Sequence, residues 1–454
     1  QFARQDQMIQ SLDPNCGGEC IGNDQGGPTL ELTGVASVGR QRFTPQPRLN
    51  ERIQLVETIS FFGGNHALKA GLDFNYINTR ETALPLHFGG RYIFASLPGT
   101  VLAAIGQPPR ATPLSPVEAL ALGLPAAYVQ GYGTVGASYK DSDISLFVQD
   151  DWKISSRLML KAGLRYQRQT PYDDIDYTVS TPGGSSMTYK YPADNNNFAP
   201  RVALAFDPAG DGRTSLHAAY GLFYDNQIIA VGQIGAGING AANGVRTLVL
   251  RFPASIAPWR APGHRMPEPS TPYPSLVISP DPGMETPYAH QAAVGFDRAL
   301  GQDVSVTANF VYVRGKNQLG TIDYNPVVPS LGAGRRPNDI GGRAGTSASI
   351  LQYTSFGETW YKGLTVSVNK RLRNNYQFMA SYTLSKAEDN STDFQSAFIV
   401  QDNGQGRNPA DPNGLPLGFN AASERGPATH DQRHRFVLSG LYQFPWDVQL
   451  STIT

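Results

Sequence analysis

Hydrophobic and polar residues alternate along residues 145–167, which read SLFVQDDWKISSRLMLKAGLRYQ. Before the pair Ser155-Ser156, every second position is mostly apolar, and the positions between them are mostly polar. The same alternation resumes after the pair. A period of two indicates β-strands, and a break at small polar residues indicates a turn between them. We therefore predict an antiparallel hairpin with long arms, one apolar face and one polar face.

The same hairpin pattern recurs along the chain. Further turns are indicated by Gly, Asn, Asp or Pro near residues 63–64, 208–212, 301, 374 and 445–446. The connections between hairpins are much longer, and they cover roughly 9–49, 79–139, 171–197, 226–285, 316–356 and 388–429. Because successive strands of an up-and-down sheet run in opposite directions, all short turns should share one rim and all long loops the other.

This asymmetry is typical of outer-membrane barrels, which have short periplasmic turns and long extracellular loops. We predict an all-β, transmembrane antiparallel up-and-down β-barrel in the cell outer membrane, with about thirteen spanning strands in this sequence. A soluble β-rich binding protein would also show alternation. Its strands, however, are typically about 5–6 residues long, whereas these reach about 13. Loops of this length without helical periodicity are also uncommon in compact soluble domains.

The two faces of the predicted strands should have different surroundings. Ten residues at ~3.3 Å each, tilted by ~40°, span ~25 Å, which matches the apolar band of a barrel between its aromatic girdles. We expect the apolar face to contact lipid through Leu146, Val148, Trp152, Leu158, Leu160, Leu164, Tyr166, Val366, Phe378 and Tyr382. We expect the polar face to line the lumen through Gln149, Lys153, Lys161, Arg165, Thr365, Asn369 and Ser381.

Composition narrows the classes of function. The 37 basic and 37 acidic residues cancel, so the chain has no electrostatic signature of nucleic-acid binding. The mean hydropathy is −0.30, and no run approaches the ~18 apolar residues of a membrane-spanning helix. The 48 glycines and 34 prolines suit a protein with many turns.

Two cysteines, Cys16 and Cys20, lie in the segment NCGGEC. We predict a disulfide across this small loop, which requires an oxidising compartment. Two free thiols remain the alternative. Half of a zinc site is disfavoured, because the chain has no second cysteine pair and no histidine nearby.

No other motif predicts catalysis or a cofactor. The GAGING segment at 235–240 matches a dinucleotide fingerprint but lies in a Gly-rich loop rather than between a strand and a helix. His430 and His434 would lie ~13 Å apart on a strand, too far for one metal ion. The neighbours Asp150 and Asp151 point to opposite faces. We predict that the protein is not an enzyme; calcium bound by the EDNSTD segment at 388–393 remains an alternative, although the EF-hand glycine is missing.

Several segments resemble TonB-dependent outer-membrane receptors, most closely the large Oar-like branch. They are the 145–167 segment quoted above, NNFAPRVALAFDPAGDGRTSLHAAYGLFYD, YKGLTVSVNKRLRNNYQFMASYTLSKAEDN, DQRHRFVLSGLYQFP and NHALKAGLDF. The resemblance spans nearly the whole chain from about residue 30, in its strands rather than in its loops.

The resemblance implies a barrel of about 22 strands around an N-terminal plug. It also implies import of a scarce or bulky ligand, driven by TonB. This sequence has no recognisable plug, TonB box or terminal aromatic strand, and both ends read as interrupted. We therefore expect residues 1–454 to be part of one barrel domain, with the plug and any regulatory-like domain elsewhere in a longer protein. The expected partners are outer-membrane lipid, the plug, TonB and an unknown ligand. A passive porin or a structural, surface-exposed barrel is the alternative.

Overall fold

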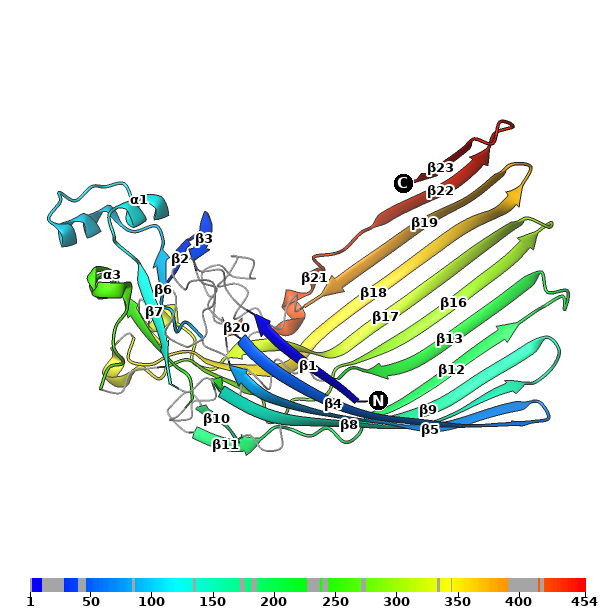
Figure 1. The fold of residues 1–454 in the computed structure, drawn as a ribbon, viewed down its shortest axis with the longest axis horizontal. Helices are drawn as coiled ribbons and strands as arrows, with labels where there is room; N and C mark the ends of the chain where they lie inside the picture. The colour runs from blue at the N-terminus through cyan, green and yellow to red at the C-terminus, as the bar shows by residue number, and fades with distance from the viewer. Residues whose placement is uncertain are drawn as a thin grey trace.

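One large curved sheet dominates the computed structural model. The described residues are 2–9, 28–39, 46–83, 86–133, 136–171, 176–180, 186–226, 237–238, 244–270, 275–332, 335–343, 345–390, 415–416 and 420–454. The sheet has 16 strands, and its main path runs β1-β4-β5-β8-β9-β12-β13-β16-β17-β18-β19-β22-β23 (Figure 1). No helix in these ranges is long and apolar enough to cross a membrane.

The predicted hairpins are confirmed. The path consists of β1 (Phe2–Ile9), β4 (Gln46–Gly63), β5 (His66–Ala83), β8 (Gly136–Lys153), β9 (Leu158–Pro171), β12 (Phe198–Phe206), β13 (Thr214–Tyr224), β16 (Tyr288–Leu300), β17 (Val304–Asp323), β18 (Ile350–Arg373), β19 (Tyr376–Asp389), β22 (His434–Gln443) and β23 (Gln449–Ile453). Each hairpin pair is antiparallel. The short turns lie together at one end of the sheet and the long connections at the other (Figure 1). The predicted up-and-down topology is therefore correct.

The short turns have the backbone chemistry that tight hairpins require. Between β18 and β19, Asn374 and Asn375 have φ values of 56° and 67°. Two consecutive left-handed residues match the hairpin turn whose twist suits the flanking strands. Between β12 and β13, the Asp207 carboxylate accepts hydrogen bonds from the backbone N–H groups of Gly210 and Gly212, each at 2.8 Å. These hydrogen bonds, that from Gly212 first, hold the pKa of Asp207 below its usual value.

Some strands extend beyond their predicted ends. β17 has 20 residues and β18 has 24, so the loop expected at 316–356 is wrong at both of its ends. Their pairing shifts register between Gly315 and Gln318 and again between Gln318 and Gly320. A bulge turns the side chains that follow it and interrupts the period-two pattern. The sequence pattern therefore stopped at the bulge, although the strands continue.

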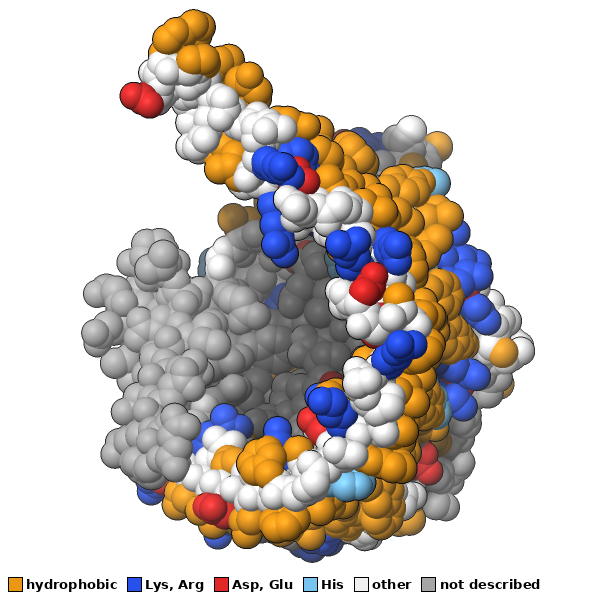
Figure 2. Space-filling model, turned by 90° about the vertical axis from the view of Figure 1, so that its right-hand side faces the viewer, with side chains coloured by type: hydrophobic (Ala, Val, Ile, Leu, Met, Phe, Trp, Pro, Cys, Tyr) orange, Lys and Arg blue, Asp and Glu red, His pale blue; other side chains and the backbone are white. Residues whose placement is uncertain are grey.

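The sheet separates hydrophobic from polar side chains. Cross-strand register places Leu146 opposite Leu72 on β5 and opposite Tyr166 on β9, and it places Val148 opposite Ala70 and Leu164. We call this side the apolar face, and the side that carries the alternate residues the polar face. Figure 2 shows hydrophobic side chains over most of the convex outer side, while basic, acidic and other polar side chains line the concave side.

The long connections contain regular secondary structure of their own, which the sequence pattern did not predict. A second sheet, ordered β14-β7-β6-β2-β3, lies beyond the loop end of the large sheet (Figure 1). Its elements, with the short helices that accompany it, are β2 (Thr29–Leu32), β3 (Ala36–Gly39), β6 (Arg91–Phe94), β7 (Ala127–Tyr132), β14 (Arg246–Arg251), α1 (Pro116–Ala121), α3 (Ile256–Arg260), η2 (Gly99–Ile105) and η3 (Pro262–His264). We call residues 28–39, 86–133 and 244–270 the outer loop module. Its buried core includes Tyr92, Phe94, Leu114, Leu124 and Tyr128.

A second buried cluster connects the loops to the ends of the long strands. It joins Tyr139 of β8, Leu319 of β17 and Tyr353 of β18 with residues from the loops, among them Leu86 and Ile278. The remaining elements here are β10 (Asp176–Ser180), β11 (Ser186–Lys190), β15 (Val277–Pro280), β20 (Leu415–Pro416), β21 (Gly426–Pro427), η4 (Pro329–Leu331), η5 (Ile340–Gly342) and η6 (Ala421–Glu424). Apolar side chains from several connections are thus removed from water together, so these loops form one packed layer.

Candidate functional site: the polar face and the outer loop module

Charged side chains on the polar face are paired across the strands. The Lys161 ammonium lies 3.0 Å from the Asp151 carboxylate, which also accepts a 2.8 Å hydrogen bond from Gln149. One step along, Arg165 approaches Asp73 at 3.9 Å, and Asp73 accepts a 3.1 Å hydrogen bond from Gln54. These contacts connect β4, β5, β8 and β9. The polar face can therefore hold charges of both signs in fixed positions.

A second polar network lies further along the sheet. The His217 ring contacts the Asp297 carboxylate at 3.3 Å and the Asn309 amide oxygen at 3.1 Å. Asp297 also accepts a 2.7 Å hydrogen bond from the Thr307 hydroxyl. Gly295 lies between His217 and Asn309 in the register, and a Cβ there would lie 1.9 Å from the imidazole Nε2. The glycine leaves the space in which a hydrogen bond can pass over the intervening strand.

Polar contacts continue toward the loop end. Asn226, just after β13, donates a 2.9 Å hydrogen bond to Asp143 and accepts one from Gln167. Nearby, the buried Asp141 accepts a 2.9 Å hydrogen bond from Gln169. The hydrogen-bonded wall therefore extends from the middle of the strands to the base of the loops.

Each residue predicted for the lumen lies on a described strand of this sheet. Gln149, Arg165, Thr365 and Ser381 are half-buried, whereas Lys153, Lys161 and Asn369 are exposed. Thr365 and Thr383 make a 2.9 Å hydroxyl contact across β18 and β19. The structure thus brings Gln149, Lys161 and Arg165 into the networks described above. It gives Lys153 and Asn369 no comparable role among the described residues.

The residues predicted to face lipid lie on the apolar face. Leu146, Val148, Trp152, Leu164, Val366 and Tyr382 are between 39% and 52% exposed, which is high for large hydrophobic side chains. Leu158, Leu160, Tyr166 and Phe378 are partly exposed. A continuous exposed apolar surface of this kind marks an interaction with lipid or with another protein.

Aromatic pairs border this apolar face near the loop end. Tyr166 and Phe198 have ring centroids 4.9 Å apart, and Tyr224 and Tyr288 are 5.5 Å apart. The Tyr382 hydroxyl lies 2.7 Å from the His434 Nδ1. Rings with an apolar body and a polar end suit the boundary between hydrocarbon and water.

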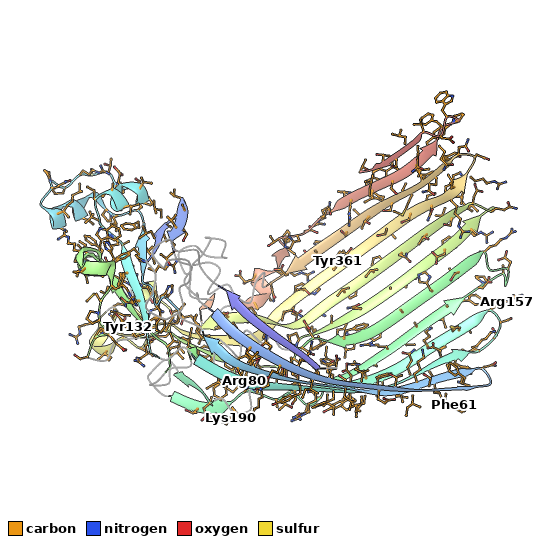
Figure 3. The ribbon with its side chains drawn as sticks, in the orientation of Figure 1. Phe61, Arg80, Tyr132, Arg157, Lys190 and Tyr361 are labelled. Carbon is orange, nitrogen blue, oxygen red and sulfur yellow. The ribbon has the colours of Figure 1, made fainter. Side chains whose placement is uncertain are left out.

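The outer loop module contains a cavity of about 460 Å³, lined by Phe88, Gln130, Gly131, Tyr132, Gly133, Arg265, Met266, Pro267 and Glu268. Figure 3 labels Tyr132 in this module. The Gln130 amide donates to the Met266 carbonyl at 3.1 Å and accepts from the Met266 N–H at 3.0 Å. The Tyr132 hydroxyl donates to the same carbonyl at 2.9 Å. Burial, with a contribution from the negative charge of Glu268, raises the pKa of Tyr132 to about 12. These polar groups hold residues 265–268 against the sheet.

The pattern of hydrophobic and polar residues did not predict the outer loop module. One signal was present: the segment SPVEAL at 115–120 combines Ser and Glu three residues apart with a proline between them. In the structure the Glu118 N–H donates to the Ser115 hydroxyl at 3.2 Å, and the Ser115 N–H donates to the Glu118 carboxylate at 2.7 Å. This reciprocal capping box begins α1. The pairing of β2, β6, β7 and β14 joins distant segments and has no local signature.

Some predictions fall outside the described residues. Cys16 and Cys20 lie outside the described residues, so the disulfide between them stays a prediction. The GAGING and EDNSTD segments lie only partly within the described ranges. In the part of the chain that the structure describes, no group of three or more His, Cys, Asp or Glu side chains could hold a metal ion.

Comparison with known proteins extends the geometric argument. A family profile described as "Outer membrane beta barrel domain" matches residues 4–450. No curated protein matches the chain significantly. Among solved structures, the outer membrane transporter YddB from Escherichia coli aligns with a TM-score of 0.52 and 12% identity, over 97% of this chain and 45% of that one. At this identity the likeness concerns the fold.

Two further structures align less closely. The FrpB iron transporter from Neisseria meningitidis (F3-3 variant) gives a TM-score of 0.44 and 12% identity over 91% of this chain and 43% of that one. The Serratia marcescens hemophore receptor HasR, solved as a double mutant with its hemophore HasA and heme, aligns with a TM-score of 0.45 and 13% identity. The alignment covers 92% of this chain and 52% of that one. The chain thus spans about half the length of these proteins. With its family profile covering almost every residue and its strands arranged as an outer-membrane barrel, the chain belongs to the outer membrane beta barrel domain family.

Proposed function

We propose that this chain forms the membrane-spanning wall of a TonB-dependent transporter. In this proposal the convex apolar face contacts lipid, and the concave polar face surrounds the path of a scarce or bulky ligand. The observation that carries the proposal is the continuous hydrogen-bonded polar face, from Lys161 and Asp151 to Asp141 and Gln169. Such a wall can bind the surface of a folded plug or line a water-filled passage.

Two features support a wide, plugged barrel over a narrow one. The path from β1 to β23 contains thirteen strands, and no pairing joins these two edge strands within the described residues. A barrel must close to leave no unpaired strand edge in the membrane, so the proposal includes further strands that complete the wall. Barrels of about 22 strands hold a plug in the lumen, because an empty lumen of that width would leak.

The outer loop module supports a role in ligand capture. It lies at the loop end, where a ligand arriving from outside is first met (Figure 1). Its own buried core gives it a fixed shape, and rigid support for a binding surface lowers the entropic cost of binding.

The alternative is a passive porin or a structural surface barrel without active transport. Potassium conductance in planar bilayers separates the two without requiring the ligand. We expect the complete protein to show no conductance in KCl, because the plug would fill the lumen. A variant that lacks the plug-encoding region should conduct. Steady conductance by the complete protein would favour the porin.

A further inference from the structure

Two lysines face each other on the apolar face, near the loop end. Lys362 on β18 is the direct register partner of Lys386 on β19, and Tyr312 of β17 lies on the other side of Lys362. The next pair toward the short turns on this face is Leu364 and Leu384, 43% and 47% exposed. The lysines therefore lie directly beside the apolar band.

The position of Lys362 along the strand matches the outer boundary of the membrane. Twelve positions separate Lys362 from Asn374 in the turn, which corresponds to ~30 Å along the membrane normal for a strand tilted by ~40°, just beyond the ~25 Å apolar band. Figure 3 shows the adjacent residue, Tyr361, in the loop-side part of the sheet, far from the turn end where Phe61 and Arg157 lie. With the loops outside the cell, this is the level of the outer-leaflet headgroups.

Positive charge is in excess around this lysine pair. Glu388 lies 2.5 Å from Lys386 and 2.7 Å from Arg425, and Glu358 lies 2.9 Å from Arg314. We call Arg314, Lys362, Lys386 and Arg425 the outer cation cluster. Its four cations face two carboxylates, Glu358 and Glu388, which leaves two positive charges in excess. Lys362 is exposed and has no ion-pair or hydrogen-bond partner among the described residues.

One aromatic ring, that of Trp360, lies close to two of these cations. The Arg425 guanidinium lies 4.1 Å from the centroid of the Trp360 ring, and Arg314 lies 5.9 Å from it on the other side. Trp360 is the register partner of both Arg314 and Glu388. Ion pairs and the Trp360 ring therefore fix three of the four cations beside the apolar surface. Among the described residues of the cluster, Lys362 alone has no such contact.

Like charges directly opposite each other on neighbouring strands destabilise a sheet. The ion pair of Lys386 with Glu388 offsets part of this cost but leaves Lys362 without an anion among the described residues. A bound anion would remove that cost, and the lysine stems can lie along the apolar surface while their ammonium groups reach a polar layer. We propose that Lys362 and Lys386 bind a phosphate group of an outer-leaflet glycolipid, whose acyl chains lie against Phe310, Leu364 and Leu384. This inference goes beyond the transport proposal, because it holds for active and passive barrels alike.

The test measures glycolipid retained by the complete protein after purification in mild detergent, by native mass spectrometry. The lipids are diphosphorylated lipid A and its dephosphorylated form. Basic residues near a charged membrane surface each contribute about fivefold to binding. Lys362→Gln and Lys386→Gln should each reduce retention of the phosphorylated lipid about fivefold and the double variant about 25-fold, whereas Lys362→Arg should retain it. Retention of the dephosphorylated lipid should already be low and should not change.

The matched control is Arg435→Gln. Arg435 is an exposed cation of β22 on the polar face, opposite Thr383, which lies three residues closer to the short turn than Lys386 does. Its substitution should leave retention within about twofold of the unmodified protein. Heat-modified mobility in gel electrophoresis verifies that each variant has folded. Equal retention by the lysine variants and the unmodified protein would overturn the proposal, and so would complete displacement of the lipid by millimolar inorganic phosphate. Either result would leave the transport proposal intact.

Discussion

Glycines on the polar face make room for aromatic rings of the same strand or of a neighbouring strand. A Cβ on Gly71 would lie 2.5 Å from the Phe147 ring and 2.6 Å from the Glu57 carbonyl oxygen. The ring can move, but the backbone oxygen belongs to the paired strand and cannot move without disturbing the sheet. Gly363 is covered by its own near neighbour Tyr361 in a similar way. Glycine in these strands is a packing requirement rather than a turn signal.

We expect Gly71→Ala to lower the free energy of unfolding by about 1–3 kcal/mol, the usual cost of overpacking. Gly440→Ala is the matched control, because the nearest atom to its Cβ would be 3.5 Å away. Urea titration of the protein in lipid vesicles measures both. Equal effects of the two substitutions would contradict the packing explanation.

Charge should be tolerated on one face only. Leu160→Arg or Val366→Arg should cost about 2–4 kcal/mol near the bilayer centre, because the guanidinium would enter hydrocarbon. Lys161→Gln should cost little, since its ion pair with Asp151 is half-exposed. Thr365→Ala loses the contact with Thr383, about 1 kcal/mol or less. Folding titrations in lipid measure these values, and similar losses for both groups would show that the faces are misassigned.

At the residue scale, a rule of alternation assigns side chains to the two faces of a strand. Period two placed Gln149, Lys161 and Arg165 on one face with no knowledge of their partners. It could not identify Asp73, His217 or Asn226 as their counterparts or as further network members, because cross-strand contacts depend on register and on chain segments far apart in sequence. Nor could it show that Gly295 makes room for the hydrogen bond from His217 to Asn309.

At the scale of single elements, α1 has a pH-sensitive beginning. The Ser115 N–H and the Arg110 guanidinium hydrogen-bond the Glu118 carboxylate and lower its pKa from 4.5 to about 2. A carboxyl group whose pKa is lower in the folded state than in the unfolded state stabilises the folded state at pH values above the unfolded-state pKa. That contribution is lost as the pH falls from about 4.5 toward 2.

We therefore expect the amide of Leu122, which donates to the Glu118 carbonyl, to lose protection from hydrogen exchange over this window. Above pH 4.5, the protection factor of this amide should be lower in Glu118→Gln than in the unmodified protein. Between pH 4.5 and 2, it should stay nearly constant in the variant while it falls in the unmodified protein. A Gln variant with the same pH profile as the unmodified protein would show that this carboxyl group does not hold the start of the helix.

Strands that are joined by a long connection also pair directly in the large sheet. β13 pairs directly with β16 from Thr214 and Arg298 to Tyr224 and Tyr288, although the connection between them is long. Deleting 226–285 removes β14 from the outer loop module but leaves this pairing in place. We expect the deletion variant, and one that lacks 388–429, to assemble with normal heat-modified mobility while ligand binding is lost. Failure of either variant to insert would indicate that the loops are required for assembly.

Strands and turns with a local sequence pattern could be predicted, whereas strands that pair with distant segments could not. Hairpins combine period-two alternation with turn residues such as Asn374 and Gly64, and every one of the six was found. The far ends of β17 and β18 were missed because bulges interrupt the alternation. In the outer loop module, β7 pairs with β14 across more than a hundred residues, so no local pattern predicts that sheet. The capping box of α1 was the local signal that could have been used.

In the proposed arrangement of the whole molecule, lipid lies outside the curved sheet and a polar lumen lies inside it. The exposed apolar side chains and the paired charges of the polar face both follow from this arrangement. The outer cation cluster, the aromatic boundary and the loop module then fall at the levels expected for headgroups and for the cell exterior.

The most direct measurement of this separation is fluorescence quenching along β18. Single cysteines at Leu364, Thr365, Val366 and Ser367, in a variant whose Cys16 and Cys20 are replaced by Ser, would each carry a polarity-sensitive dye. The account predicts that brominated lipids quench the labels at 364 and 366, while a water-soluble quencher reaches those at 365 and 367. Uniform quenching along the four positions, or the opposite alternation, would contradict it.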